Sequence, residues 1–132
     1  MLIDVEGGWI ELARPSDDGG APDLLLEVTA RIDGFQGFVE VWVETAAWAD
    51  FVHALTQLEA TRRGAATIES ISPGELTLTL RSTDAAGHMT ASGQLRRDGA
   101  EAKLSMAFGP CALDPSLLPE LVRLSRQLAK RH

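Results

Sequence analysis

The 132-residue chain has a single cysteine, Cys111, so it cannot form an internal disulfide or a thiolate cluster for zinc or iron. It also lacks the apolar run of about 18 residues that a membrane-spanning helix needs. Asp4 and Glu6 stand where a secretory signal peptide would have a basic start. These absences predict a cytoplasmic protein that makes no use of a membrane.

Sequence motifs of catalysis are missing as well. The chain has no glycine-rich phosphate loop, no nucleophile elbow and no H-E-x-x-H helix, and its glycines cluster in predicted turns. Cys111 follows Pro110 in a predicted loop, with no recognisable base beside it. We therefore predict no catalytic residue, no metal and no cofactor, and a protein that is not an enzyme.

Basic residues are scarce in the first sixty positions, where only Arg14 and Arg31 stand against twelve acidic residues. The remaining part of the chain has ten basic and seven acidic residues, and the net charge is −7. If the acids share one face of the fold, their field attracts cationic partners and repels nucleic acid. The charge distribution thus predicts a binder of a cationic protein.

The composition is typical of one globular domain over residues 1–132. Hydrophobic residues make up 45% of the chain and charged residues 23%, which is far from the composition of disordered proteins. A chain of this length can bury roughly two thirds of its unfolded surface in a single core.

A hairpin is predicted over residues 24–44, where two alternating runs flank Asp33-Gly34, a dipeptide typical of a tight primed turn. A two-residue turn places Ile32 opposite Phe35 and Val28 opposite Val39 on one apolar face. The other face then pairs Arg31 with Gln36, Thr29 with Phe38, Glu27 with Glu40, Leu25 with Trp42 and Asp23 with Glu44.

The same reasoning predicts a second hairpin around Asp98-Gly99. A two-residue turn there places Leu95 opposite Ala102 and Met89 opposite Phe108 on an apolar face. On the reverse, Arg96 faces Glu101 as a cross-strand ion pair, and Gln94 faces Lys103.

Three more strands are predicted at residues 9–14, 66–71 and 75–81, and two helices at residues 46–63 and from residue 116 onward. Leu117, Leu121, Leu124 and Leu128 form the predicted buried stripe of the second helix. The fold class is α+β, with the order βββαββββα. We expect a curved antiparallel sheet of about seven strands packed on a central helix, with the C-terminal helix at a remaining edge or end.

Glu27 and Glu40 are the most informative polar pair, because like charges directly across a hairpin destabilise it. A basic protein, a metal, or an arginine such as Arg14 or Arg81 on an adjacent strand would compensate, or solvent alone screens the two charges. A catalytic dyad sharing one proton would need a desolvated cleft, which nothing in the sequence indicates.

Phe38 and Trp42 share the predicted face with these acids, and rings among carboxylates resemble the centre and rim of an interface. Alternatively, the C-terminal helix packs on this face and covers Trp42. Trp9 and Trp48 are predicted in the core, and His88 in a structural or exposed position. The candidate partner-binding residues are Glu27, Phe38, Glu40, Trp42 and Glu44.

Several patterns together resemble a known family. They are Trp9 opening an amphipathic strand, the acidic hairpin, Trp48-Ala-Asp-Phe51-Val52-His-Ala-Leu55, the Leu76-Thr-Leu-Thr-Leu80 strand, Gly87-His88-Met89 and the leucine-rich last helix. The chain is similar, from about Trp9 to Leu128, to the WapI-type immunity proteins of contact-dependent toxin systems. The resemblance implies a non-enzymatic cytoplasmic protein that neutralises a basic toxin, and it assigns no residue a role.

Two other function classes stay open. A small-molecule or lipid sensor would hold its ligand in a cavity between sheet and helix. An enzyme would need a cleft containing His88 and at least one carboxylate with a perturbed pKa. The sequence gives neither the identity of the partner nor the oligomeric state.

Overall fold

The computed structural model describes residues 1–17 and 19–130 and has an α+β fold of two antiparallel four-stranded sheets and two helices. Sheet A has the order β1-β2-β3-β4, and sheet B has the order β5-β6-β7-β8. The strands of sheet A are β1 (Leu2–Val5), β2 (Gly8–Ala13), β3 (Leu24–Ile32) and β4 (Phe35–Val43). Those of sheet B are β5 (Ala65–Glu69), β6 (Leu76–Ser82), β7 (Met89–Asp98) and β8 (Lys103–Leu113).

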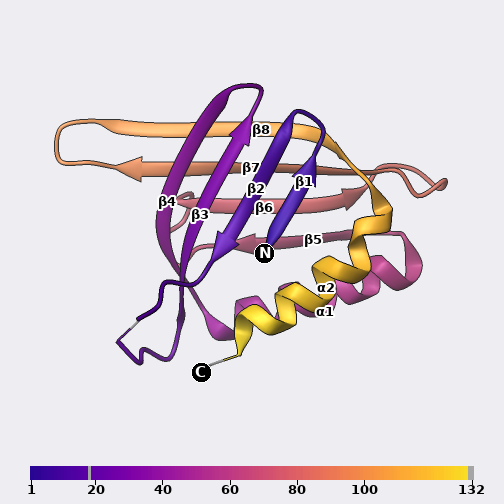
Figure 1. The fold of residues 1–132 in the computed structure, drawn as a ribbon, viewed down its shortest axis with the longest axis horizontal. Helices are drawn as coiled ribbons and strands as arrows, with labels where there is room; N and C mark the ends of the chain where they lie inside the picture. Colours follow the sequence, from indigo (N-terminus) through magenta and orange to yellow (C-terminus); the bar gives the residue numbers. More distant parts are fainter. Residues whose placement is uncertain (18, 131–132) are drawn as a thin grey trace.

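The two sheets lie face to face, and their strands cross obliquely (Figure 1). Alternation within each strand sends one set of side chains into the space between them: in β3, Leu26, Val28 and Ala30 are fully buried. From the other layer, Leu78 and Leu80 of β6 are buried in the same core. Each sheet therefore covers the apolar face of the other.

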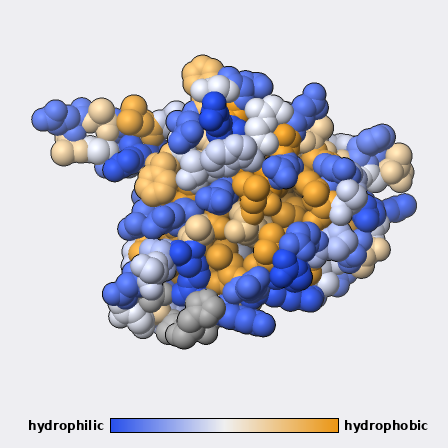
Figure 2. Space-filling view, in the orientation of Figure 1, coloured by the Kyte–Doolittle hydropathy of each residue, from blue (hydrophilic) through white to orange (hydrophobic). Residues whose placement is uncertain are grey.

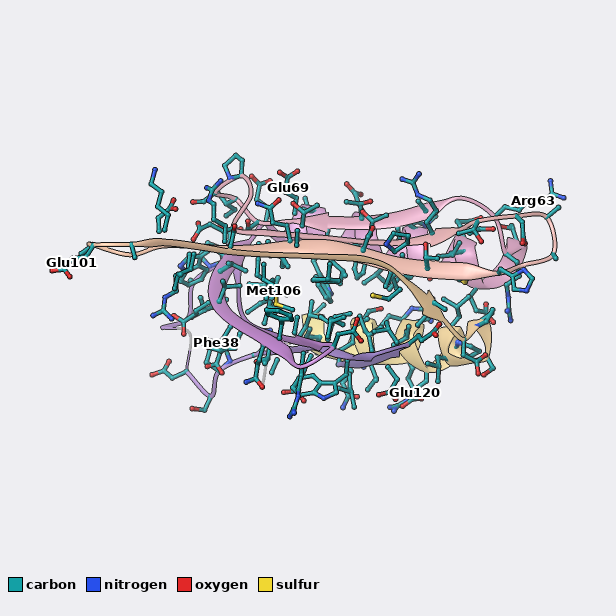
Figure 3. All side chains as sticks on the ribbon, turned by 90° about the horizontal axis from the view of Figure 1, so that it is seen from above. Phe38, Arg63, Glu69, Glu101, Met106 and Glu120 are labelled. Atoms are coloured by element: carbon teal, nitrogen blue, oxygen red, sulfur yellow. The ribbon has the colours of Figure 1, made fainter. Side chains whose placement is uncertain are left out.

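The helices close one side of this sandwich rather than fill a curved sheet. Helix α1 (Thr45–Thr61) packs against β5 and against α2 (Leu118–Ala129), which follows a 3-10 turn at Pro115–Leu117. Seen from above, α1 lies level with sheet B and α2 with sheet A (Figure 3). The buried residues of α1 are Trp48, Phe51, Leu55 and Leu58.

The predicted single curved sheet on a central helix is thus wrong in detail. The structure has eight strands, because the short β1 at Leu2–Val5 also pairs with β2. Helix α1 carries the chain from one sheet to the next, so the two apolar sheet faces cover each other and leave the helix at their margin. Each half of the chain has four strands followed by a helix, a repeat of topology that the sequence does not show.

The first hairpin has the predicted register. Ile32 pairs with Phe35, and the pairing continues through Glu27 with Glu40 and Leu25 with Trp42. Asp33 and Gly34 both have positive φ values, 50° and 83°, as a primed turn requires.

The second hairpin has a different register. Residues Gly99 to Ala102 form its connection, closed by a 2.8 Å bond from the Gly99 N–H to the Ala102 carbonyl. Leu95 consequently faces Met106, and a bulge at Ala91/Gly93 brings Met89 opposite Leu113. The predicted partners of Arg96 and Gln94 are wrong: they face Ser105 and Ala107. Arg96 instead lies 3.6 Å from Asp98 and donates to the Pro73 carbonyl.

The buried stripe of α2 also differs from the prediction. Leu118, Leu121, Val122 and Ser125 are buried, whereas Leu117, Leu124 and Leu128 are half-buried. The 3-10 turn before α2 changes which residues face the core, because it rotates the chain by a different angle per residue.

The pH dependence of stability tests the hydrogen bond that begins the 3-10 turn before α2. The pKa of Asp114 is lowered from 3.8, because its carboxylate accepts a 2.9 Å hydrogen bond from the Ser116 N–H. The unfolded chain takes up this proton at a higher pH, so the contribution of Asp114 to stability is present above pH 3.8 and is lost as the pH falls below it. We expect Asp114→Asn to lower the melting temperature at about pH 6 and to have a smaller effect at about pH 2.5. A melting-temperature difference independent of pH would contradict this.

Candidate functional site: the outer face of sheet A

Three of the predicted binding residues lie side by side on β4. Phe38, Glu40 and Trp42 alternate with the buried Val39 and Val41, so their side chains point away from the core. Phe38 is 45% exposed and Trp42 is 40% exposed. The structure therefore places two aromatic side chains at the surface, with a carboxylate between them.

Glu27 joins this group from β3. It pairs directly with Glu40, and Ala13 of β2 lies on its other side. Among the described residues, no arginine or lysine forms an ion pair with Glu27 or Glu40. Arg81 lies in sheet B, paired with Ala65 and Thr90, so it is not the compensating residue.

Glu44 lies apart from the strand face. It follows the end of β4 and occupies the N-cap position of α1, without a side-chain capping bond. The next residue, Thr45, donates its hydroxyl to the Pro22 carbonyl at 2.6 Å. Glu44 is exposed at the corner where β4 turns into the helix, so it borders the face rather than belonging to it.

Helix α2 does not seal Trp42, because it packs on α1 at the side of the sandwich. The Trp42 carbonyl accepts a 2.9 Å bond from the Ile71 N–H, which holds the end of β4 beside the loop after β5. The structure thus contradicts the alternative in which the C-terminal helix covers Trp42.

The prediction that Trp9 lies in the core is wrong. Ile10 and Leu12 of β2 are buried, so Trp9 points outward, half-buried between Asp4 of β1 and Arg31 of β3. Trp48, in contrast, is 1% exposed, as predicted.

Two further acids extend the group. Asp4 lies opposite Trp9, and Glu11 lies opposite Thr29, which in turn pairs with Phe38. Both are exposed. Sequence reasoning missed Asp4 because β1 was not predicted, although Leu2–Val5 alternates as a strand does. It missed Glu11 because the sequence does not show which strand β2 pairs with. We call the set Asp4, Trp9, Glu11, Glu27, Phe38, Glu40 and Trp42 the acidic face. In a space-filling view of this side, hydrophilic side chains surround an apolar area near α2 (Figure 2).

A cleft of about 850 Å³ lies between the β3–β4 hairpin tip and β8. Its apolar lining comes from both sheets and includes Phe35, Phe38, Leu104, Met106 and Phe108. Met106 points from β8 into the space between the layers (Figure 3). Cys111 also lines this cleft, in β8 rather than in the predicted loop, and burial, Asp33 and Glu6 raise the pKa of its thiol.

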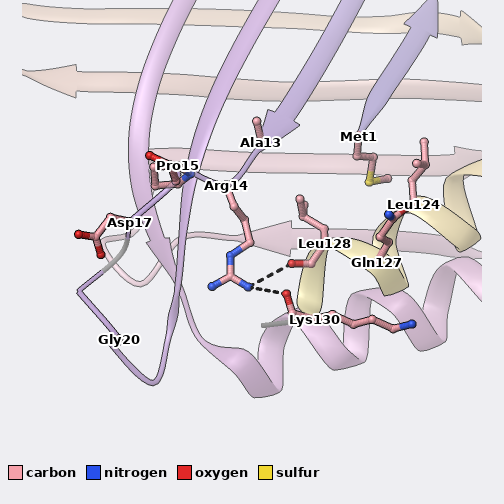
Figure 4. A pocket seen from close by; sticks show the side chains of 11 residues that line it. Met1, Ala13, Arg14, Pro15, Asp17, Gly20, Leu124, Gln127, Leu128 and Lys130 are labelled. Atoms are coloured by element: carbon pink, nitrogen blue, oxygen red, sulfur yellow. Dashed lines mark hydrogen bonds between the residues drawn. The ribbon is translucent and has the colours of Figure 1, made fainter. Parts of the chain in front are cut away.

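A second hollow, of about 670 Å³, lies between the end of β2 and α2 (Figure 4). Leu124 and Leu128 form apolar parts of its wall. The Arg14 guanidinium donates to the carbonyls of Leu128 and Lys130 at 3.3 and 3.2 Å, so it ties the strand to the end of the helix.

His88 lies immediately before β7, with its Nδ1 atom 2.6 Å from Asp84 Oδ2. The hydrogen bond from His88 lowers the pKa of Asp84. Both side chains are exposed, 76% and 46%, and neither lines one of the two hollows. The pair orders an exposed loop.

Within residues 1–17 and 19–130, no group of three or more histidine, cysteine or acidic side chains has the arrangement of a metal site. Over the same residues, neither helix has the length and apolar character that crossing a bilayer requires.

Comparisons with protein-family models, with curated proteins and with solved structures returned no match for this chain.

Proposed function

We propose that this chain is a non-enzymatic binding protein whose acidic face docks a cationic protein, and that its role is that of an immunity protein neutralising a basic toxin. The observation that carries the proposal is the exposure of Phe38 and Trp42 on either side of Glu40. Large aromatic side chains are usually buried in a monomer, and at interfaces they supply much of the binding energy.

Electrostatics supports the same partner. Glu27 and Glu40 face each other, and Asp4 and Glu11 lie on the same side of the sheet. Bringing arginine or lysine side chains to this face relieves the mutual repulsion of the carboxylates. Complementary charge chiefly accelerates encounter and restricts the choice of partner, which suits rapid neutralisation of a toxin.

Reversing the charge of two acidic residues tests whether the acidic face binds the partner. The binding partner for this test is a basic toxin domain, sought first in the product of the adjacent gene, and its association is followed by surface plasmon resonance at low and high salt. We expect Glu40→Lys/Glu44→Lys to lower the association rate about tenfold or more at low salt, and raised salt to slow the wild type.

Asp50→Lys/Glu69→Lys is the matched control. It makes the same charge change at two exposed acids, one on α1 and one on β5, outside the acidic face. If both double variants lost association rate equally, net charge rather than the acidic face would account for the effect. Unchanged association in Glu40→Lys/Glu44→Lys would refute the assignment of the face.

A second candidate is a small-molecule or lipid sensor, favoured by the hollow between β2 and α2. Leu124 and Leu128 would contact an apolar tail there. Two cationic groups of its wall are engaged internally: the Met1 ammonium donates to the Leu12 carbonyl at 2.7 Å, and Arg14 donates to the carbonyls of Leu128 and Lys130. The side chain of Lys130 also lines this hollow. Fatty acids that raise the melting temperature of the wild type but not of Leu128→Lys would favour this role over toxin binding.

A further inference from the structure

The cleft between the β3–β4 hairpin tip and β8 gathers exposed apolar side chains. Among the described residues, six large apolar side chains are exposed, and three of them line this cleft: Phe35, Phe38 and Leu104, at 74%, 45% and 65%. Only Phe38 also belongs to the acidic face. Isolated apolar side chains at a surface need no explanation, whereas several in one hollow mark a binding site.

The cleft is long and has room for one small molecule. Its lining follows β8 from Leu104 to Cys111, about 20 Å at the usual rise per residue of a strand. Its volume of about 850 Å³ is within the range of small-molecule sites, about 300–1,000 Å³. Gly37 rests on Met106, since a Cβ atom on Gly37 would lie 3.1 Å from Met106 Sδ. The β3–β4 tip extends past β8 (Figure 1), so a ligand would follow the margin of β8 beside Met106, below Phe35.

Arg97 is the sole basic residue that lines the cleft. It pairs with Leu104, and strand alternation places its side chain on the same side of β7 as the buried Leu95. Among the described residues, no acid forms an ion pair with Arg97. The neighbouring Arg96 points to the other side of the strand and donates to the Pro73 carbonyl at 2.9 Å. The Arg97 guanidinium is therefore available to a ligand.

We propose that this cleft binds a free amphipathic carboxylate of the fatty-acid class, with the carboxylate on Arg97 and the chain along β8 against Met106 and Phe108. A planar guanidinium matches a carboxylate, because two parallel N–H···O bonds join them. A linear chain fits the elongated hollow, and it would cover the exposed Phe35 and Leu104, which removes apolar surface from water.

The charges at the two ends of the cleft set the direction of the ligand. Asp33 also lines the cleft, and together with Glu6 it acts on Cys111, where both carboxylates raise the pKa of the thiol. Cys111 is at the opposite end of the lining from Leu104, the partner of Arg97. A carboxylate beside Asp33 would meet like charge, so the headgroup lies at the Arg97 end.

This site does not rest on the proposed function. Glu27, Glu40 and Trp42 do not line the cleft, so a bound ligand leaves most of the acidic face open. The cleft is also separate from the hollow between β2 and α2, with which it shares no lining residue. Leu128→Lys, in that hollow, should therefore leave binding in the cleft unchanged.

Isothermal titration calorimetry of the full chain with laurate, below its micelle concentration, measures the binding. We expect one laurate per chain with a Kd of about 0.1 mM or lower, and dodecylamine, with the same chain length and a cationic head, to bind about tenfold more weakly or less. Arg97→Glu should reverse this preference, weakening laurate about tenfold or more and strengthening dodecylamine.

Arg63→Glu is the matched control for the charge. It makes the same change at an exposed arginine between α1 and β5, outside the cleft, and should bind laurate as the wild type does. For the apolar wall, Leu104→Asp should weaken laurate about tenfold or more. Ile71→Asp should not, since Ile71 is also exposed, at 45%, but lies outside the cleft. All four variants change exposed residues and should keep the circular dichroism of the wild type.

Several results would overturn the proposal. They are no saturable binding of laurate up to about 1 mM, equal losses in Arg97→Glu and Arg63→Glu, and loss of binding in Leu128→Lys. An apparent Kd that rises with protein concentration would mean that a second copy of the chain occupies the cleft, which would also overturn it. Phosphatidylglycerol vesicles should not bind, because the net charge of −7 opposes an anionic surface. Binding to these vesicles without binding to laurate would assign the cleft to a membrane instead.

Discussion

Trp48→Ala is expected to lower the free energy of unfolding by about 3–5 kcal/mol, the range for removing a large aromatic side chain from a core. Trp48 is 1% exposed, and its ring centroid lies 5.2 Å from that of Phe51. Its Nε1 atom donates a 2.9 Å bond to the Ser125 carbonyl, so this one side chain joins α1 to α2. Urea unfolding followed by circular dichroism measures the loss.

Trp48→Phe separates the hydrogen bond from the packing. It keeps most of the apolar volume and loses the bond, so we expect a smaller loss of about 1–2 kcal/mol. Trp42→Ala makes the same chemical change as Trp48→Ala at a surface position that is 40% exposed. We expect it to cost about 1 kcal/mol. Equal losses at Trp42 and Trp48 would contradict the assignment of Trp42 to the acidic face.

Gly8→Ala is expected to destabilise the protein by about 3 kcal/mol or more, because a methyl group there meets backbone rather than a flexible side chain. A Cβ atom on Gly8 would lie 1.7 Å from the Arg31 carbonyl oxygen and 3.2 Å from the Ile32 Cα. β2 would have to move away from β3 beside Trp9, which would disturb the acidic face as well as the core.

Gly37→Ala is the control for Gly8→Ala. Its added methyl group would meet only the ends of side chains, at 3.1 Å from Met106 Sδ and 3.3 Å from Leu95 Cδ1. These can shift, so the expected cost is below about 1 kcal/mol. Thermal melts of the two variants compare the costs directly. Similar melting temperatures would mean that β2 and β3 are not as close as the structure places them.

The first hairpin could be predicted from sequence because local rules agree there. Asp33-Gly34 specifies a tight turn, and the two-residue period of β3 and β4 permits only one register with Val28 and Val39 both inward. Asp98-Gly99 is the same dipeptide, yet its connection is longer. The tip of this second hairpin projects beyond sheet A (Figure 1), so packing against sheet A does not fix its register, and contacts such as Arg96 with the Pro73 carbonyl contribute to the geometry.

The candidate site was predicted in part for the same reason. Register and alternation placed Phe38, Glu40 and Trp42 together, opposite Glu27. They did not reveal that Trp9 and Glu11 lie on the same face, because that depends on which neighbour β2 pairs with. Glu44 continued the alternation in sequence, but the start of α1 removed it from the strand.

By itself, the sequence determined which side chains alternate inward, where the chain turns at Asp33-Gly34, and that its acids concentrate in the first half. These properties follow from local backbone geometry and composition. Only the tertiary structure decided that two sheets cover each other, that α2 packs on α1 and leaves Trp42 exposed, and that β8 ends as an uncovered edge. The physical reason is that an apolar face specifies that it must be buried, whereas the element that buries it is chosen by the packing of the whole chain.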